Sequence, residues 1–212
     1  MEKTNITETP LIGLLDKIGQ LIILGVCWII GSLPVVTLGT STTALYYAVI
    51  KSIRRGQGYA LGEFWKSYKA NLRRGILATV IMLFAAGLLC LNLWTLQQAE
   101  QDNTAMMLAN GLCLAVLCIS WIYLCPVLSR FTMGVANAWK LAFVMAIRFL
   151  PQSILLAAGV AVLAALQIWI LPVPTALLIP GLWCYVTTFV IEKVLRKYMP
   201  AKKENDDAWY YE

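Results

Sequence analysis

The sequence contains no histidine and few charged residues. Only 13% of its 212 residues are charged, whereas 60% are hydrophobic and the mean hydropathy is +0.72. A soluble globular domain is typically about a quarter charged and about half apolar. The shortage of charge excludes an ordinary soluble domain. It predicts an all-α membrane protein whose residues 1–212 form a single membrane domain.

The chain also lacks the cysteine and histidine patterns of metal sites. Its cysteines form no CxxC pair, and no histidine could complete a mixed site. All of them lie in apolar stretches, where a buried cysteine packs as a small hydrophobic residue. We therefore expect no disulfide framework, no metal and no cofactor. The cysteines are Cys27, Cys90, Cys113, Cys118, Cys125 and Cys184.

A cleavable signal peptide is missing as well. The first apolar run follows an acidic lead, and no small-x-small cleavage site comes after it. We expect this run to remain in the protein as a membrane span. Pro10 and Gly13 lead us to expect irregular chain before it.

Five apolar segments are long enough to cross a bilayer of roughly 30 Å. The sequence Gly31-Ser32-Leu33-Pro34 is expected to end or kink the first of them, because proline removes a backbone donor. A second break is expected near Cys125-Pro126 in the third segment. The predicted spans are about 18–38, 75–96, 105–128, 151–170 and 175–191, followed by a cytosolic tail over 193–212.

The basic residues mark one side of this bundle. Of the 17 Lys and Arg residues, 15 fall in segments 39–74, 129–150 and the tail after residue 192. The alternate loops 97–104 and 171–174 contain none. The positive-inside rule then places the N-terminus outside and the C-terminus in the cytoplasm of a bacterial cell membrane. Because these charges flank apolar segments, we expect the lipid bilayer and no nucleic acid as partner.

Three shorter segments, 42–55, 59–74 and 129–150, are predicted to be amphipathic helices in the cytosolic interface. In 59–74 the apolar residues Phe64, Trp65 and Tyr68 share one face, opposite the cations. Such a helix fits the headgroup region. The alternative is a helix that packs on the protein's own cytosolic side.

Segment 129–150 has an alternative of its own. If it crossed the membrane, the chain would have six spans, Lys140 would lie at membrane depth and the tail would move outside.

Candidate interaction residues lie on these helices. Pro34, Thr37 and Gly39 form a structural break between the first span and the first of them. The residues predicted to contact the interface or a docked partner are Tyr46, Tyr47, Trp65, Lys66, Lys69, Arg73, Trp139, Lys140 and Arg148.

No arrangement of residues predicts catalysis. The cores of the predicted spans contain no charged side chain, and Glu63 and Glu192 have no acidic partner nearby in the sequence. We expect a non-enzymatic protein. Neutral polar residues either join helices or line a small polar cavity. They are Asn92, Gln97, Asn110, Ser120 and Gln167.

The segment Leu33-Pro34-Val35-Val36-Thr37-Leu38-Gly39, followed by Thr43-Ala44-Leu45-Tyr46-Tyr47, resembles the YesL family of bacterial integral membrane proteins. The stretch from Phe64 to Asn71 also matches the family's pattern. The resemblance covers nearly the whole chain in length and order of segments. Where members often have proline after the glycine, this chain has Thr40.

The resemblance implies no catalytic residue, because the family has no established activity. Its members are often encoded beside carbohydrate ABC importers. This implies an accessory role in carbohydrate uptake or its sensing, with an ABC importer permease or a sensor kinase as partner. The alternative is a small oligomeric carrier or channel with a neutral polar path, and an enzyme acting on lipid-linked sugars comes third.

Overall fold

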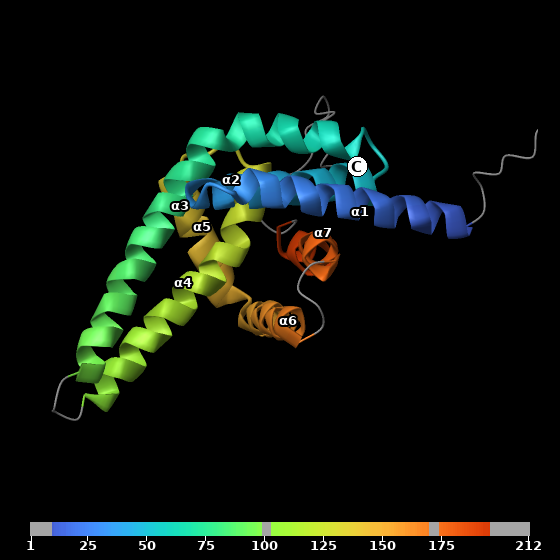
Figure 1. Ribbon diagram of the computed structural model, residues 1–212. Helices are drawn as coiled ribbons and strands as arrows, with labels where there is room; N and C mark the ends of the chain where they lie inside the picture. The colour runs from blue at the N-terminus through green and yellow to red at the C-terminus, as the bar shows by residue number, and fades with distance from the viewer. Residues whose placement is uncertain (1–9, 99–102, 170–173, 196–212) are drawn as a thin grey trace, which may run out of the picture.

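The computed structural model describes residues 10–98, 103–169 and 174–195, and every element in these ranges is helical. Figure 1 shows the arrangement. The elements are α1 (Pro10–Ser32), the 3-10 turn η2 (Val35–Thr37), α2 (Leu38–Ala48), the π-helical turn η3 (Val49–Arg54), α3 (Ala60–Gln98), α4 (Thr104–Arg130), α5 (Val135–Arg148), α6 (Leu150–Trp169) and α7 (Pro174–Leu195).

Helix α1 ends at the predicted break, before the predicted end of the span at about residue 38, and it begins earlier than predicted. It stops at Ser32, one residue before Leu33-Pro34. The Thr37 hydroxyl lies 2.7 Å from the Gly31 carbonyl oxygen, and Tyr68 donates to the same oxygen at 3.2 Å, so a carbonyl at the helix end is satisfied. The expectation of irregular chain at Pro10 was wrong. Proline is tolerated in the first turn, where its missing N–H would have no helical partner.

The segment predicted as one helix over 42–55 begins earlier and changes type. Helix α2 starts at Leu38, and its last turn widens into η3. The chain then reverses at Gly56 and Gly58, whose φ angles of 65° and 79° favour glycine.

The segments predicted as an interfacial helix over 59–74 and a span over 75–96 form one helix, α3, of 39 residues. Gly75 does not break it, because this glycine serves a close contact with α2. A Cβ at Gly75 would lie 2.6 Å from the Thr40 Cα. The Gly39 amide donates to the Thr79 hydroxyl across the same crossing at 3.0 Å. Helix α3 bends along its course and then descends beside α4 (Figure 1).

The C-terminal half of α3 and helix α4 form a long hairpin with large apolar side chains on its outside. Phe84 is 69% exposed and Leu108 is also 69% exposed. Apolar exposure on this scale marks a surface that lipid or protein covers. The expected break at Pro126 was wrong, because α4 continues through this proline to Arg130. Transmembrane helices tolerate proline where neighbouring groups satisfy the backbone.

Helix α5 is short and packs along α4. Its 14 residues span roughly 21 Å at 1.5 Å per residue, which is less than a hydrocarbon core. Its inner stripe includes Ala138, Ala142 and Met145, all fully buried. It meets α6 at 98°. The Ser153 hydroxyl secures this corner, since it contacts the Ala146 carbonyl and the Tyr123 hydroxyl, both at 3.0 Å.

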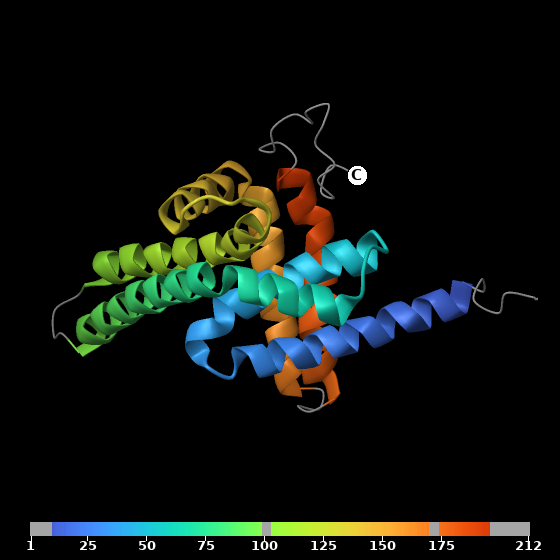
Figure 2. The same ribbon diagram turned by 90° about the horizontal axis from the view of Figure 1, so that it is seen from above.

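Helices α6 and α7 run crosswise to α1 and to the α3–α4 hairpin. They are seen nearly end-on in Figure 1 and lengthwise in Figure 2. By length and composition three described helices could cross a membrane, namely α1, α3 and α4, or four if α5 and α6 count as one bent span. These helices support the membrane class. Five spans and the interfacial position of the shorter helices are not established by this geometry. Residues 1–9, 99–102, 170–173 and 196–212, with most of the tail, lie outside the described residues.

Candidate functional site

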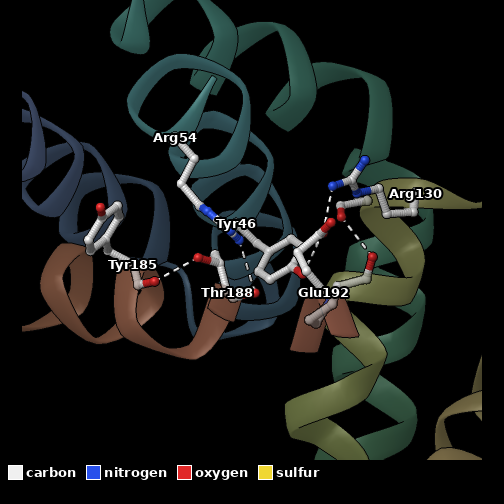
Figure 3. A network of polar contacts seen from close by, with 8 residues as sticks. Tyr46, Arg54, Arg130, Tyr185, Thr188 and Glu192 are labelled. Carbon is white, nitrogen blue, oxygen red and sulfur yellow. Dashed lines mark hydrogen bonds and ion pairs between the residues drawn. The ribbon is translucent and has the colours of Figure 1, made fainter. Parts of the chain in front are cut away.

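A buried charge cluster joins α2, α4 and α7. The Arg130 guanidinium donates to Glu192 Oε1 at 2.5 Å, and the Tyr46 hydroxyl donates to the same oxygen at 3.1 Å (Figure 3). The side chains of Arg130 and Glu192 are 1% and 8% exposed, and Tyr46 is 2% exposed. An ion pair this deep is shielded from water, so each charge depends on the other. We call these three residues the buried cluster.

The helix ends explain how the buried cluster forms. Arg130 is the last residue of α4, Glu192 lies in the last turn of α7, and Tyr46 lies near the end of α2. Burial and the nearby Glu192 carboxylate raise the pKa of Tyr46 well above its usual 10.0. Its phenol therefore stays neutral at ordinary pH and remains a hydrogen-bond donor.

Arg54 extends this contact between η3 and α7. Its guanidinium donates to the Thr188 carbonyl at 3.2 Å (Figure 3) and also lies 4.4 Å from the centre of the Phe189 ring. A guanidinium over an aromatic face is attracted by the ring's negative face. The turn before α3 is thereby held against the end of α7.

The buried cluster has the chemistry of a structural clamp. Only three carboxylates lie in the described ranges, and the other two are engaged elsewhere. Asp16 accepts from Gln20 at 2.9 Å, and Glu63 pairs with Lys51 at 2.9 Å. Glu192 therefore has no described carboxylate beside it with which to share acid and base roles.

Reasoning from the sequence missed this pair, because Arg130 and Glu192 are 62 positions apart and each was assigned to a helix end facing the cytosol. One signal was present. Glu192 is the single acidic residue between Asp102 and Glu204. A lone carboxylate at the end of an apolar segment, in a chain with so few acids, calls for a cationic partner.

An apolar cavity of about 790 Å³ lies next to the buried cluster. Its walls come from α1, α2, α4, α6 and α7, with one residue from α3. Tyr46 and Thr187 bring the cavity close to the cluster, and none of the described residues that line it is charged. Its volume falls in the range of about 300–1,000 Å³ that small-molecule sites occupy. Among the lining residues are Trp28, Ile122, Cys125, Trp183 and Ile191.

Four of the neutral polar residues considered from the sequence have described side chains, and these four do not line this cavity. Asn110 donates from α4 to the Leu89 carbonyl of α3 at 3.0 Å, which joins the two helices. Ser120 donates to its own helix at Val116. Asn92 and Gln97 are exposed on the hairpin. The side chain of Gln167 lies outside the described residues.

A basic stripe lies on the outer side of the N-terminal half of α3. Lys66, Lys69 and Arg73 are exposed at i, i+3 and i+7. On the opposite side Phe64 is fully buried and the Trp65 and Tyr68 rings pack around it. The aromatic face therefore packs on the protein itself, which is the alternative considered from the sequence. We call Lys66, Lys69 and Arg73 the basic stripe.

The other residues that were predicted to contact the interface or a partner differ in exposure. Lys140 and Arg148 are exposed on α5, whereas Trp139 is half-buried and packs against Trp121. Tyr46 was wrongly placed on the contact surface, because it is buried in the cluster.

Tyr47 is half-buried and accepts a hydrogen bond from Lys51 at 3.3 Å. Burial alone would lower the pKa of Lys51, but hydrogen bonds to Glu63 and Tyr47 raise it above 10.5. Tyr47 and the Lys51–Glu63 pair thus belong to the packing around η3.

Comparison with known proteins identified a family model that matches part of the chain. No curated protein and no solved structure was matched. Residues 21–93 are similar to the family model described as "Protein of unknown function, DUF624". The match runs from α1 to the end of the first limb of the hairpin, and it contains Pro34, Thr37, Gly39 and the basic stripe. This domain occurs in YesL-like proteins, so residues 21–93, about a third of the chain, resemble a family of unknown function.

Proposed function

We propose that this protein is a non-enzymatic accessory protein of the bacterial cell membrane that docks a partner through its basic stripe. The observation that carries the proposal is the position of Lys66, Lys69 and Arg73. They share one face of α3, and none of them makes an ion pair with another described residue. Their helix is fixed from behind by the buried Phe64. A fixed row of cations suits an acidic cytoplasmic surface.

The partner class is inferred from the resemblance. It is an ABC importer permease or a membrane sensor kinase of carbohydrate uptake. Anionic lipid headgroups would also attract the basic stripe, at about 1 kcal/mol per cation near the surface. Lipid attraction and partner docking are compatible, because both place α3 at the cytoplasmic side.

Reversing all three charges of the basic stripe is expected to reduce recovery of the partner by about tenfold or more. Three exposed charge pairs at about 0.5 kcal/mol each correspond to that factor, and the new repulsion adds to it. The measurement is affinity purification of the tagged protein from native membranes, with co-purified permeases and kinases quantified by mass spectrometry. The variant is Lys66→Glu, Lys69→Glu and Arg73→Glu.

A charge-conserving variant serves as the matched control. Lys66→Arg, Lys69→Arg and Arg73→Lys keep the net charge at the same positions, so recovery is expected to stay within a factor of two of the wild type. Equal recovery of the partner with the charge-reversed and the charge-conserving variants would contradict docking through this stripe.

For the orientation, we propose that the α3–α4 hairpin crosses the bilayer with its turn outside, and that the basic segments and the tail face the cytoplasm. The distribution of 15 of 17 basic residues supports this. A five-span scheme adds crossings by α1, α6 and α7 and places the N-terminus outside. It requires α6 and α7 to lie along the hairpin rather than crosswise to it.

Two fusions test the orientation. Green fluorescent protein fused after residue 212 is expected to fluoresce, because it folds in the cytoplasm. Alkaline phosphatase fused after residue 100 is expected to be active, since it requires the outer side. Phosphatase activity at residue 212 with none at residue 100 would invert the proposed topology.

A further inference from the structure

We propose that the apolar cavity between α1, α2, α4, α6 and α7 binds one acyl chain of a bilayer phospholipid. The cavity is separate from the basic stripe, and the inference does not depend on partner docking. It rests on the composition of the walls, on the shape of the space and on what surrounds its opening.

The walls favour hydrocarbon over water or a polar solute. Apart from the hydroxyls of Thr42, Tyr46 and Thr187, the lining is aliphatic, aromatic or sulfur-containing. The Thr42 hydroxyl already accepts from the Trp28 indole at 3.2 Å, and the Tyr46 hydroxyl is held by Glu192. Water needs several polar partners to occupy a cavity, and here few polar groups remain for it.

The cavity extends furthest along α7. On α7 it is lined from Ile179 to Ile191, a distance of roughly 18 Å at 1.5 Å per residue. On α4 it is lined from Cys118 to Pro126, roughly 12 Å. The length along α7 and the apolar volume of about 790 Å³ are large enough for an extended hydrocarbon chain.

The opening lies among lipid-facing side chains. Cys118 on α4 and Val160 on α6 line the cavity and are themselves exposed, Val160 by 41%. Leu155 and Val162, on other faces of α6, are also exposed apolar residues. In a membrane, exposed apolar surfaces are in contact with lipid acyl chains. Acyl chains would therefore surround the opening of the cavity. An empty apolar space of this size would forgo the contacts that close packing supplies.

The charged end of the space determines how deep the chain can go. Ile191 is the last lining residue on α7, and the next residue is Glu192, paired with Arg130 in the buried cluster. A hydrocarbon chain would stop at the Tyr46 ring, because an acyl chain gains no favourable contact from a neighbouring ion pair.

Photocrosslinking tests the proposal. The full-length protein is placed in nanodiscs of phosphatidylethanolamine and phosphatidylglycerol, with a small amount of phosphatidylcholine that carries a diazirine at the end of one acyl chain. We expect crosslinks at the inner wall, on peptides containing Trp183 and Ile122. Ala157, which lines the cavity, is then replaced by phenylalanine to fill it. Ala157→Phe should lower these crosslinks on the order of tenfold.

Ala158→Phe is the matched control. Ala158 is the next residue of α6, is exposed and does not line the cavity, so its replacement should leave the inner crosslinks unchanged. Val160→Phe provides a second filling variant at a position whose exposure leaves room for the larger ring. The crosslinking of each filling variant is compared with that of Ala158→Phe after their elution profiles and melting midpoints have been shown to be equal. This requirement excludes misfolding as the cause of a loss.

Three outcomes would overturn the proposal. The first is equal inner crosslinking in Ala157→Phe, Val160→Phe and Ala158→Phe. The second is crosslinking confined to outward residues such as Leu155 and Val162. The third is mass-spectrometric recovery, from protein purified from cell membranes, of a bound polyisoprenoid lipid in place of acyl phospholipid.

Discussion

Replacing Glu192 by glutamine is expected to lower the free energy of unfolding by about 3–5 kcal/mol. The change leaves the Arg130 guanidinium buried without its carboxylate, and breaking one half of a buried ion pair has a cost of this size. For a chain of about 200 residues this corresponds to a fall in melting midpoint of roughly 10 °C. The midpoint can be measured as the temperature at which the monodisperse fraction in detergent falls by half.

Two comparisons make this test specific. Lys193→Gln changes the charge of the next residue on α7, which is exposed, and should shift the midpoint by less than about 2 °C. The double replacement Arg130→Met and Glu192→Leu removes both charges, and should recover most of the loss. A Glu192→Gln protein as stable as Lys193→Gln would show that the pair contributes little to the fold.

Replacing Gly75 by alanine is expected to destabilise the protein by about 2 kcal/mol. The added methyl group would lie 2.6 Å from the Thr40 Cα and 2.7 Å from the Thr40 amide nitrogen, so α2 and α3 would have to separate. Overpacking of this kind costs about 1–3 kcal/mol, more than the roughly 1 kcal/mol that alanine adds in helix propensity. The melting midpoint should fall by about 4–8 °C.

Gly87→Ala is the matched control on the same helix. No atom lies within 4 Å of a Cβ built at Gly87, so only the gain in helix propensity remains. Its midpoint should equal or exceed that of the wild type. If both alanine variants had the same midpoint, the close crossing of α2 and α3 would not be a determinant of stability.

The local features of the fold could be predicted from the sequence. Pro34 ends α1, and Gly56 and Gly58 turn the chain, because these residues restrict or permit particular backbone angles regardless of context. The amphipathic pattern around Phe64 was also correct. A period of 3.6 residues identifies which side chains share a face, but it does not say whether lipid or protein covers that face.

The errors arise where tertiary contacts decide. Pro126 lies within α4, and the residues on either side of it, Cys125 and Val127, are buried. Packing therefore keeps this stretch helical despite the proline. Gly75 reads as a boundary between two segments, yet it is the contact point of one continuous helix. The buried cluster depends on residues of α2, α4 and α7, and no local pattern joins them.

The continuity of α3 has a mechanical consequence. At 1.5 Å per residue its 39 residues measure roughly 58 Å along the helix axis, with the basic stripe in the N-terminal part and Trp94 near the C-terminal end. The helix bends along its course, but no loop interrupts it, and its close crossing with α2 lies at Gly75. The basic stripe and Trp94 are therefore joined by continuous helix, without a flexible segment between them.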